Sequence, residues 1–431
     1  MVESVARGVR TNTGSGGMAD RNLPYTEIVA GALLFLMLVF ATSTVFVREA
    51  WAMQSFQVGI YAILAVYLLA GIRRKSELLS QGWLAWLVYL MPLWGVVQLL
   101  ARTTSSSFET RQAVLRWGAL AGVFFLSQSV TRSSTARQYF LNAFLGFASC
   151  MAVLCLTQLF TSQGRVLWMF PTGYPDVYAT FPYQNNYVQF VELALPIALW
   201  KAIREGWRAW WYPLAGGILY ASSIAAASRA GAVLCTLELL AMLGIGWVRL
   251  RGQKRNRFSR SAIAVLVIVP VLAAAFTFAV GWQRLSERFR TIDPDVTRGA
   301  FLVSAVKMAE HRPLTGFGLD TFPRVYQGYA IRDFPFYANH AHNDWAEFAA
   351  DGGIPFLLLA LIPFAAVIPS CIRYPWALGL IAILLHACVD YPFPRPAVSG
   401  WIYALLGALY MARVTNSRAD SMKVQTPKTG M

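Results

Sequence analysis

Charged side chains and histidines are scarce in this chain. Asp, Glu, Lys and Arg together make up 13% of its 431 residues, only four residues are histidine, and 57% are hydrophobic. Soluble globular domains carry about 25% charged residues. The charge content and the mean hydropathy of +0.48 therefore exclude an ordinary water-soluble protein and indicate one with many membrane-spanning segments.

Cysteine is also rare, and several common enzyme motifs are missing. The five cysteines all lie inside apolar runs, at Cys150, Cys155, Cys235, Cys371 and Cys388, where a free thiol behaves as a small hydrophobic side chain. We expect neither a disulfide nor a metal cluster from them. The chain also lacks a Walker loop, a dinucleotide fingerprint and a convincing zinc motif. If it is an enzyme, its substrate must arrive already activated, and we expect no cofactor.

Long apolar runs are what the sequence has instead. A helix needs about 20 apolar residues to cross about 30 Å of hydrocarbon, and about twelve runs approach that length. They lie at 27–47, 53–72, 82–101, 113–130, 139–160, 184–203, 211–227, 230–249, 262–281, 348–370, 375–390 and 398–414. The predicted fold class is all-α: a polytopic membrane protein of about 12 transmembrane helices with one long loop that contains short amphipathic helices.

Basic residues predict the orientation of these spans. Cytoplasmic loops carry an excess of Lys and Arg, and one side of the predicted topology holds "RLRGQKRNRFSR" (249–260) and the basic tail. The net charge of +16 is then mostly a topogenic signal and not a nucleic-acid surface. The predicted regions are a disordered cytoplasmic leader (1–24), N-terminal helices (25–160), central helices with a periplasmic loop at 161–183 (161–281), a long periplasmic loop (282–347), C-terminal helices (348–414) and a basic cytoplasmic tail (415–431). The first apolar run lacks a cleavage site and should remain as an anchor.

The long loop at 282–347 interrupts the hydropathy pattern, and irregular connections of that length are usually functional. Within it, "RGAFLVSAVKMAEH" (298–311) places Phe301, Ala305 and Met308 on one helical face. This pattern predicts an amphipathic helix at the membrane surface. The following "RPLTGFGLDTFP", with its proline and glycines, predicts a turn. A separately folded soluble domain is less expected, because so short a segment buries little core.

Two of the four histidines, His340 and His342, stand where this loop returns to the membrane, beside Asn343 and Asp344. One interpretation is a polar helix start, with Asn343 or Asp344 as N-cap. A second is a metal site formed by His340, His342 and Asp344. A third, which we favour, is an imidazole acting as general base, because an ordinary imidazole pKa near 6.5 suits removal of a hydroxyl proton at neutral pH.

Arginine is the second candidate group. Arg229 interrupts an otherwise apolar run, and the loop adds Arg284, Arg288, Arg290 and Arg298. An unpaired arginine in lipid costs at least about 2.5 kcal/mol, so Arg229 should face a polar cavity or a partner, unless it only marks a tight external turn. Guanidinium binds phosphate oxygens in a bidentate manner. Some of the loop arginines are alternatively expected to form solvated ion pairs with nearby acids.

Two further stretches carry polar residues at the predicted ends of spans. "LLHACVDYPFPRPA" (384–397) places His386 and Asp390 four residues apart on one helical face, as a functional or a purely structural pair. "FPYQNNYVQFVELALPIAL" (181–199) opens a span with amides that include Asn186. Such amides suit carbohydrate hydroxyls, although helix capping explains them nearly as well.

These motifs, taken in order, resemble the O-antigen ligase and O-antigen polymerase superfamily of bacterial inner-membrane glycosyltransferases. The resemblance covers roughly residues 181–397 and rests on the two stretches just quoted together with "ASRAGAVL", "RGAFLVSAVKMAEHRPLTGFGLDTF" and "AHNDWAEFAADGGIPFLLL". It implies a GT-C-like helical fold. It also implies metal-independent transfer of a glycan from an undecaprenyl-diphosphate carrier to a sugar hydroxyl on the periplasmic face.

The resemblance also implies roles for particular residues. The two essential arginines of the family fall on Arg229 and Arg298, and its histidine before Asn falls on His342; we add Arg288 as a third diphosphate contact and His340 as the residue that orients His342. The supporting residues are Asn343, Asp344, Asn186, His386 and Asp390. The family pattern then reaches a glycine at Gly353, and it departs at Phe356, where the family has Gly, Thr or Tyr.

Three functions remain open from the sequence. A ligase transfers to lipid A core, whereas a polymerase transfers to a second lipid-linked glycan with the same donor chemistry. A multi-pass transporter or lipid flippase would explain the number of helices, but it predicts internal repeats and charges near the bilayer midplane. No convincing repeat is present, and the ionisable residues concentrate at one face.

Overall fold

The structure is a computed structural model that describes residues 25–73, 83–205, 209–251, 293–335 and 337–425, with the single positions 271, 275 and 286. Within these residues, seven helices are long and apolar enough to cross a membrane by length and composition. They are α1 (Tyr25–Ser43), α2 (Ala50–Arg73), α4 (Ser107–Val130), α5 (Ser134–Thr161), α8 (Arg229–Arg251), α13 (Asp344–Arg373) and α15 (Pro396–Gln425). The chain is a mostly helical, multi-pass membrane protein.

Four further helices lie among the candidate spans: α3 (Trp83–Leu100), α6 (Gln184–Glu205), α7 (Trp211–Ala225) and α14 (Gly379–His386). Eleven of the predicted apolar runs therefore coincide with helices, whereas the run at 262–281 and Arg284, Arg288 and Arg290 lie outside the described residues. One predicted boundary is wrong. The run at 375–390 was expected to form a single span, but a 3-10 turn (Pro375–Ala377) precedes α14 and the helix ends at His386, so Asp390 lies in a loop.

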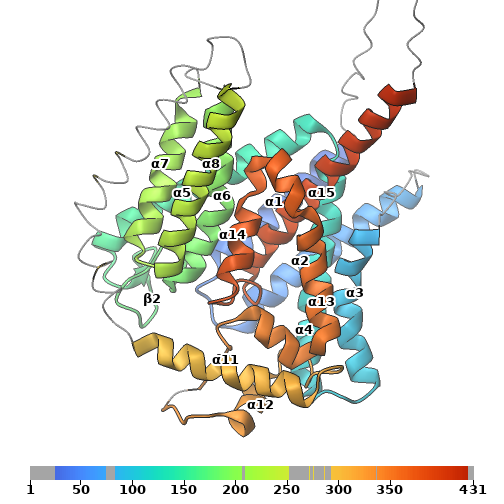
Figure 1. The fold of residues 1–431 in the computed structure, drawn as a ribbon, viewed down its shortest axis with the longest axis vertical. Coiled ribbons are helices and arrows are strands. Elements are labelled where there is room, and N and C mark those ends of the chain that lie inside the picture. Colours follow the sequence, from blue (N-terminus) through green and yellow to red (C-terminus); the bar gives the residue numbers. More distant parts are fainter. Residues whose placement is uncertain are drawn as a thin grey trace, which may run out of the picture.

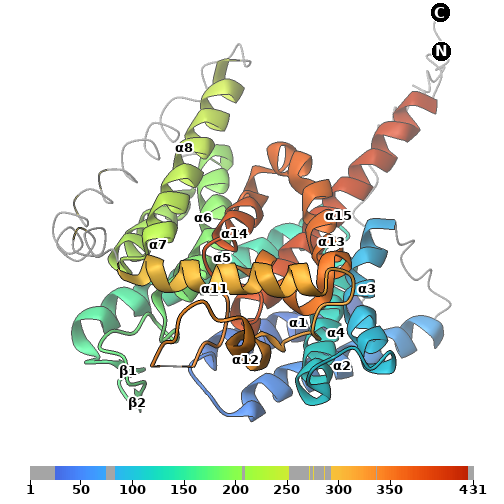
Figure 2. The same cartoon turned by 60° about the horizontal axis from the view of Figure 1, so that its bottom comes forward.

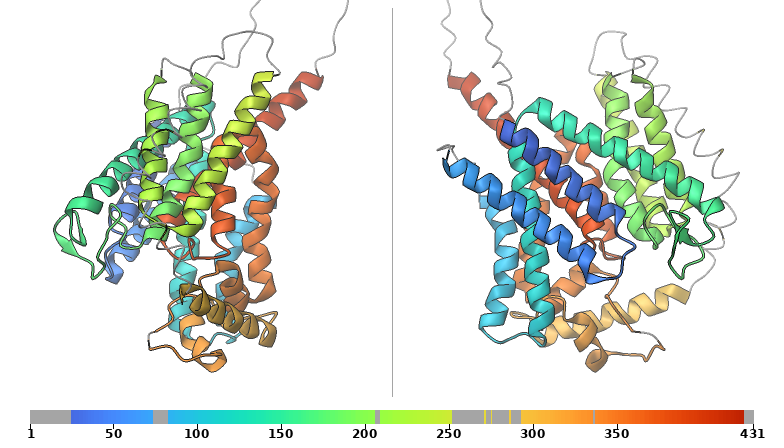
Figure 3. Two further views of the ribbon diagram at one scale, coloured as in Figure 1. Left: turned by 60° about the vertical axis from the view of Figure 1, so that its left-hand side comes forward. Right: turned by 180° about the vertical axis from the view of Figure 1, so that it is seen from behind.

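Helices α4 and α15 are largely buried within the bundle (Figures 1 and 3). In the apolar window of α15, 89% of residues are buried inside the protein, and in that of α4 72% are, against 17% in α2. Trp401 of α15 stacks on Phe144 of α5 with ring centroids 4.2 Å apart, and Trp117 of α4 packs against Phe348 and Phe356 of α13. The central helices are thus held by aromatic packing, and α2 lies at the periphery.

Helices α6, α7 and α8 pack together on one side of the bundle (Figure 1). The connection from α7 to α8 is tight, with Ala227 in the left-handed region at φ 56° immediately before Ser228 and Arg229. Helices α6 and α8 therefore run in the same direction, and their N-termini open at the same end of the bundle. The segment between α5 and α6 forms a small hairpin of β1 (Arg165–Val166) and β2 (Phe170–Pro171).

The loop after α8 folds into α11 (Asp293–His311), α12 (Phe322–Val325) and a 3-10 turn (Tyr326–Tyr329). Helix α11 runs across the end of the bundle (Figure 2). The predicted helix is present, and its apolar face packs against protein, while its place at the membrane surface stays a prediction. Phe301, Ala305 and Met308 are buried in a small second core with Phe322 and Ala350, because the loop supplies its own aromatic partners.

The predicted turn after α11 is also present, and it fastens the loop to the bundle. The side-chain amide of Gln98 on α3 donates to the carbonyls of Thr315 and Asp351, at 2.6 and 2.8 Å. Helix α13 breaks at Gly353, whose φ of 69° and ψ of 179° are essentially restricted to glycine. This break lets the Ile354 N–H donate to the Pro313 carbonyl at 2.7 Å, so the turn and the broken helix form one unit.

Candidate active site

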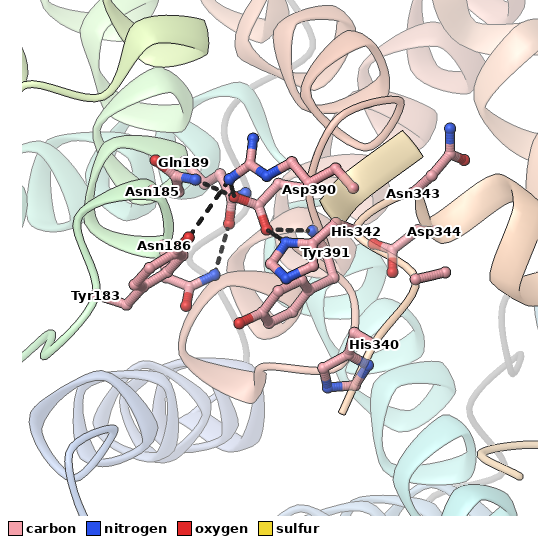
Figure 4. Close-up of polar contacts among 12 residues, drawn as sticks. Tyr183, Asn185, Asn186, Gln189, His340, His342, Asn343, Asp344, Asp390 and Tyr391 are labelled. Carbon is pink, nitrogen blue, oxygen red and sulfur yellow. Dashed lines mark hydrogen bonds and ion pairs between the residues drawn. The ribbon is translucent and has the colours of Figure 1, made fainter. Parts of the chain in front are cut away.

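Asp390, in the loop between α14 and α15, is the centre of a polar cluster (Figure 4). Its side chain is fully buried. The Asn185 amide at the start of α6 donates to its Oδ2 atom, and the N–H of Tyr391 donates to its Oδ1 atom at 2.9 Å. The Asp390 N–H donates to the His386 carbonyl at 3.0 Å, which continues the last turn of α14 into the loop. Main-chain and amide donors therefore fix this carboxylate before a substrate binds.

His342 faces the same carboxylate from the end of the loop. Its Nδ1 atom lies 3.4 Å from Oδ1 of Asp390, within ion-pair range but not aligned as a hydrogen bond. The ring also packs edge-on against Tyr391. His342 has φ 54°, a left-handed conformation that is uncommon for residues other than glycine and that concentrates at functional sites. The backbone thus bends so that Nδ1 of this imidazole faces Asp390, and Nε2 is the ring nitrogen on the other side.

The charge of Asp390 is stabilised by its neighbours. Burial acts to raise the pKa of this carboxyl group, but His342, His386 and Arg298 together lower it below its ordinary value. Two buried phenols beside it behave differently, since burial raises the pKa of Tyr183 and of Tyr391. At neutral pH the cluster therefore holds one carboxylate between neutral hydroxyl groups and cationic or imidazole partners.

Arg298, near the start of α11, approaches Asp390 from the other side. Its Nη2 atom lies 3.9 Å from Asp390 Oδ2 and donates to the Tyr183 hydroxyl at 3.4 Å. Arg298 and Arg229 line one cavity of about 310 Å³, together with Tyr183, Asn185 and Ala230. The N-termini of α6 and α8 open into this cavity, and helix N-termini favour anions. Two arginines and two helix N-termini thus give this cavity, the anion cavity below, a lining that favours negative charge, with Asp176 as the acidic residue in it.

His340, predicted to orient His342, makes its direct contacts with two other residues. Its Nδ1 atom pairs with Glu347 Oε1 at 2.9 Å, and its ring stacks on Tyr391 with centroids 4.4 Å apart. Tyr391 therefore contacts both histidine rings. The group that faces His342 is the carboxylate of Asp390, so His340 supports the loop through Glu347 and Tyr391.

The remaining predicted residues occupy structural positions around the cluster. Asn343 is the N-cap of α13: its Oδ1 accepts from the Ala346 N–H at 2.9 Å and its Nδ2 donates to the Cys388 carbonyl. Asp344 accepts from the Phe393 N–H at 3.1 Å. Asn186 donates to Gln189 at 3.0 Å and lines a second hollow beside the cluster. The polar helix start that the sequence left open is thus formed by Asn343.

The proposed pairing of His386 with Asp390 is replaced by a different one. His386 Nδ1 lies 2.8 Å from Glu192 Oε1, and both side chains are fully buried between α14 and α6. The alternative metal site is not assembled either: within the described ranges, no three His, Cys, Asp or Glu side chains are grouped so that they could hold a metal ion. Asp344 instead accepts from the Phe393 N–H, and His340 Nδ1 pairs with Glu347 Oε1.

Sequence reasoning did not select Tyr183, Asn185 or Tyr391 as site residues. Tyr183 and Asn185 belong to the amide-rich stretch at 181–199. The sequence alone does not distinguish Asn185 from Asn186, and only the fold shows that Asn185 contacts Asp390. Tyr391 was overlooked because aromatic residues are frequent in this chain. Its position directly after Asp390 in "VDYPFP" was the available signal.

Comparison with known families gives one result. A family model described as O-antigen ligase matches residues 214–362, a range that contains Arg229, Arg298, His342 and the helix break at Gly353, while Asn185 and Asp390 lie outside it. Neither the curated proteins nor the solved structures compared with this chain give a significant match. The match agrees with the ordered motifs, and over residues 214–362 this chain is similar to the O-antigen ligase family.

Proposed function

We propose that this chain is an O-antigen ligase-like glycosyltransferase of the bacterial inner membrane. It would move a glycan from an undecaprenyl-diphosphate carrier to a sugar hydroxyl of lipid A core on the periplasmic face. The observation that carries the proposal is the carboxylate of Asp390, which faces an imidazole, His342, with one oxygen and a guanidinium, Arg298, with the other. A base and a phosphate-binding cation are the two groups that this chemistry requires.

In the proposed reaction, the diphosphate of the donor lies in the cavity of Arg229 and Arg298. With Nδ1 of His342 directed at Asp390, the Nε2 atom accepts the proton of the acceptor hydroxyl. The bond between the acceptor oxygen and the anomeric carbon forms while the bond from that carbon to the diphosphate oxygen breaks. The carrier diphosphate leaves with the electron pair, and its charge is met by the arginines. General base help is worth about 10² to 10⁴ in rate, and fixed cations at a leaving oxyanion are worth about as much.

Transfer in reconstituted membranes tests this proposal. We expect His342→Asn, Arg229→Gln and Arg298→Gln each to abolish most glycan transfer from a lipid-diphosphate donor at equal protein level. Two matched controls are His311→Asn, where the histidine contacts Tyr329 away from the cluster, and Arg324→Gln, where the arginine pairs with Glu109 at an exposed position. Full activity in the His342 and Arg298 variants would overturn the site assignment, and loss of wild-type activity with a chelator would require a metal.

The same donor chemistry serves a polymerase, in which the acceptor is a second lipid-linked glycan. Supplying the reconstituted enzyme with donor alone, and then with donor and lipid A core glycolipid, separates the two. A product that grows by whole repeats without the glycolipid indicates polymerisation. A product formed only with the glycolipid supports the ligase.

A further inference from the structure

Two hollows meet at the cluster, and they contain different members of it. The anion cavity of about 310 Å³ is lined by Arg229 and Arg298. A larger groove of about 1630 Å³ runs from His342 and Tyr391 toward the α1–α2 connection and the β1–β2 hairpin. Tyr183 lines both hollows. His342, the proposed base, therefore lies on the groove side of Tyr183, and Arg229 and Arg298 lie on the cavity side.

This separation assigns a substrate to each hollow. In a displacement at an anomeric carbon, the incoming oxygen and the leaving oxygen lie on opposite sides of the reacting carbon, and a general base must lie within hydrogen-bond reach of the incoming hydroxyl. We propose, on the basis of the proposed function, that the groove is the acceptor site and that it takes an anionic glycolipid. The acceptor hydroxyl then lies at His342, and the donor diphosphate stays in the cavity.

The charge of the groove defines the kind of acceptor. Arg48 and Arg395 are both exposed in its lining, against a single acidic residue, Glu49. The Arg48 Nη2 atom donates to the Thr172 carbonyl at 3.0 Å, so the guanidinium is held across the groove between the α1–α2 connection and the hairpin. The Arg395 carbonyl accepts from the Val398 and Ser399 N–H groups at the start of α15, which fixes the backbone there while the side chain stays exposed. The held guanidinium of Arg48 and the exposed one of Arg395 suit phosphate or carboxylate groups on a glycan.

The far end of the groove is apolar. It is lined by Phe46, Trp51 and Phe170, of which Trp51 is 51% exposed and Phe170 43% exposed, and the rings of Phe46 and Phe170 contact each other at 5.0 Å. Exposed aromatic side chains at the end of membrane helices are typical of the lipid headgroup level. A molecule that fills the groove therefore has acyl chains near Trp51, anionic groups at the arginines and a free hydroxyl at His342.

The test uses purified full-length protein with a core-only lipopolysaccharide and with the same glycolipid after its phosphates have been removed and its carboxyl groups reduced. We expect the double variant Arg48→Gln, Arg395→Gln to bind the untreated glycolipid about tenfold or more weakly. In wild type, each arginine would donate a charge-assisted hydrogen bond to an anionic group of the glycolipid. Binding of the treated glycolipid should be weak in wild type and unchanged in the variant. In transfer assays, the acceptor KM should rise while the donor KM and kcat stay within about twofold. Arg324→Gln should behave as wild type.

Results other than these would contradict the assignment of the groove as the acceptor site. A higher donor KM with an unchanged acceptor KM would show that the groove takes the donor. Equal weakening for both glycolipids would exclude charge recognition. Transfer that does not depend on Arg48 and Arg395 would overturn the groove assignment alone, whereas arginine-dependent binding without any transfer by wild type would overturn the proposed function and with it the acceptor role.

Discussion

The carboxylate of Asp390 and the imidazole of His342 face each other, with Oδ1 and Nδ1 3.4 Å apart, although they come from different loops. Under the proposed function, this carboxylate holds the Nδ1 side of the ring and leaves Nε2 as the base. We expect Asp390→Asn to reduce transfer by at least about 10², measured as kcat in reconstituted membranes. Asp333→Asn changes a carboxylate of the same loop region at an exposed position and should retain activity. Near wild-type kcat in the Asp390 variant would exclude this role.

Asp390 also predicts how stability depends on pH. The pKa of this carboxyl group is lower in the folded protein than its ordinary value of about 3.9. Its charge therefore stabilises the fold fully above about pH 3.9, and this contribution is lost as the pH falls further toward the folded pKa. The difference in Tm between wild type and Asp390→Asn should be constant from about pH 5 to pH 8 and shrink below about pH 3.9. A difference that shrinks between pH 8 and pH 5 would contradict the assignment.

The left-handed backbone at His342 determines which replacement is informative. Asparagine tolerates φ near 54° better than most residues. We expect His342→Asn to keep the Tm near that of wild type while transfer falls by about 10² to 10⁴. His342→Val, with a β-branched side chain at the same backbone, should lower the Tm as well. If His342→Asn transfers normally, the base must be another group.

His340 should behave differently from His342. Because it pairs with Glu347 and stacks on Tyr391, we expect His340→Asn to lower the Tm and to reduce kcat by less than about tenfold. Glu347→Gln, which changes the other partner, should give a similar profile. A loss of kcat in His340→Asn as large as that in His342→Asn would restore His340 to the catalytic pair.

The ion pair between Arg116 and Asp320 is expected to be structural. The two guanidinium nitrogens donate to the two carboxylate oxygens at 2.5 and 2.6 Å, which ties α4 to the turn after α11, and the side chains are 11% and 29% exposed. Removing one partner of such a pair leaves a poorly solvated charge, so Arg116→Gln should cost about 3 kcal/mol of stability. The exposed pair of Arg324 and Glu109 is the control, at no more than about 1 kcal/mol. Both variants should retain the wild-type substrate KM values.

Gly353 offers a test of how the loop is attached. A Cβ atom there would lie 2.7 Å from the Leu314 carbonyl carbon and 2.8 Å from the Pro313 oxygen, at a backbone conformation that costs about 1 to 3 kcal/mol for other residues. We expect Gly353→Ala to lower the Tm and to expose the loop to protease. Gly146→Ala, within α5 and with open space at the Cβ position, should be neutral or stabilising by up to about 1 kcal/mol. Equal behaviour of the two variants would exclude a role for the break.

Much of the fold was predictable because long apolar runs have only helical solutions in a membrane. Helix α1 (Tyr25–Ser43) lies close to the predicted run at 27–47, and α4 (Ser107–Val130) contains the predicted run at 113–130. The break at Gly353 was not predicted, although Gly352, Gly353 and Pro355 are a local breaking signal. Nor was the end of α14 at His386, since apolar residues continue beyond it. Both features involve partners that are distant in the sequence. The break at Gly353 packs against the backbone of Pro313 and Leu314, and His386 at the end of α14 pairs with Glu192.

The site was predictable by residue type but not by pairing. His342, Arg229 and Arg298 were selected because scarce charged groups near a membrane are costly and therefore informative. Which carboxylate faces which base depends on how the ends of α6, α11 and α14 meet. From sequence spacing, Asp390 is predicted to lie beside His386, and His340 to orient His342. In the structure, Asp390 lies beside His342, and His386 pairs with Glu192.

The cavity of Arg229 and Arg298 has a consequence for turnover. Its charges and helix N-termini are in place before any substrate arrives. Under the proposed function they bind the spent carrier more firmly than the loaded one, because the diphosphate gains negative charge when the glycan leaves. The free carrier lipid is then a product inhibitor, and the pace of glycan export depends on how quickly the surrounding membrane withdraws and recycles it.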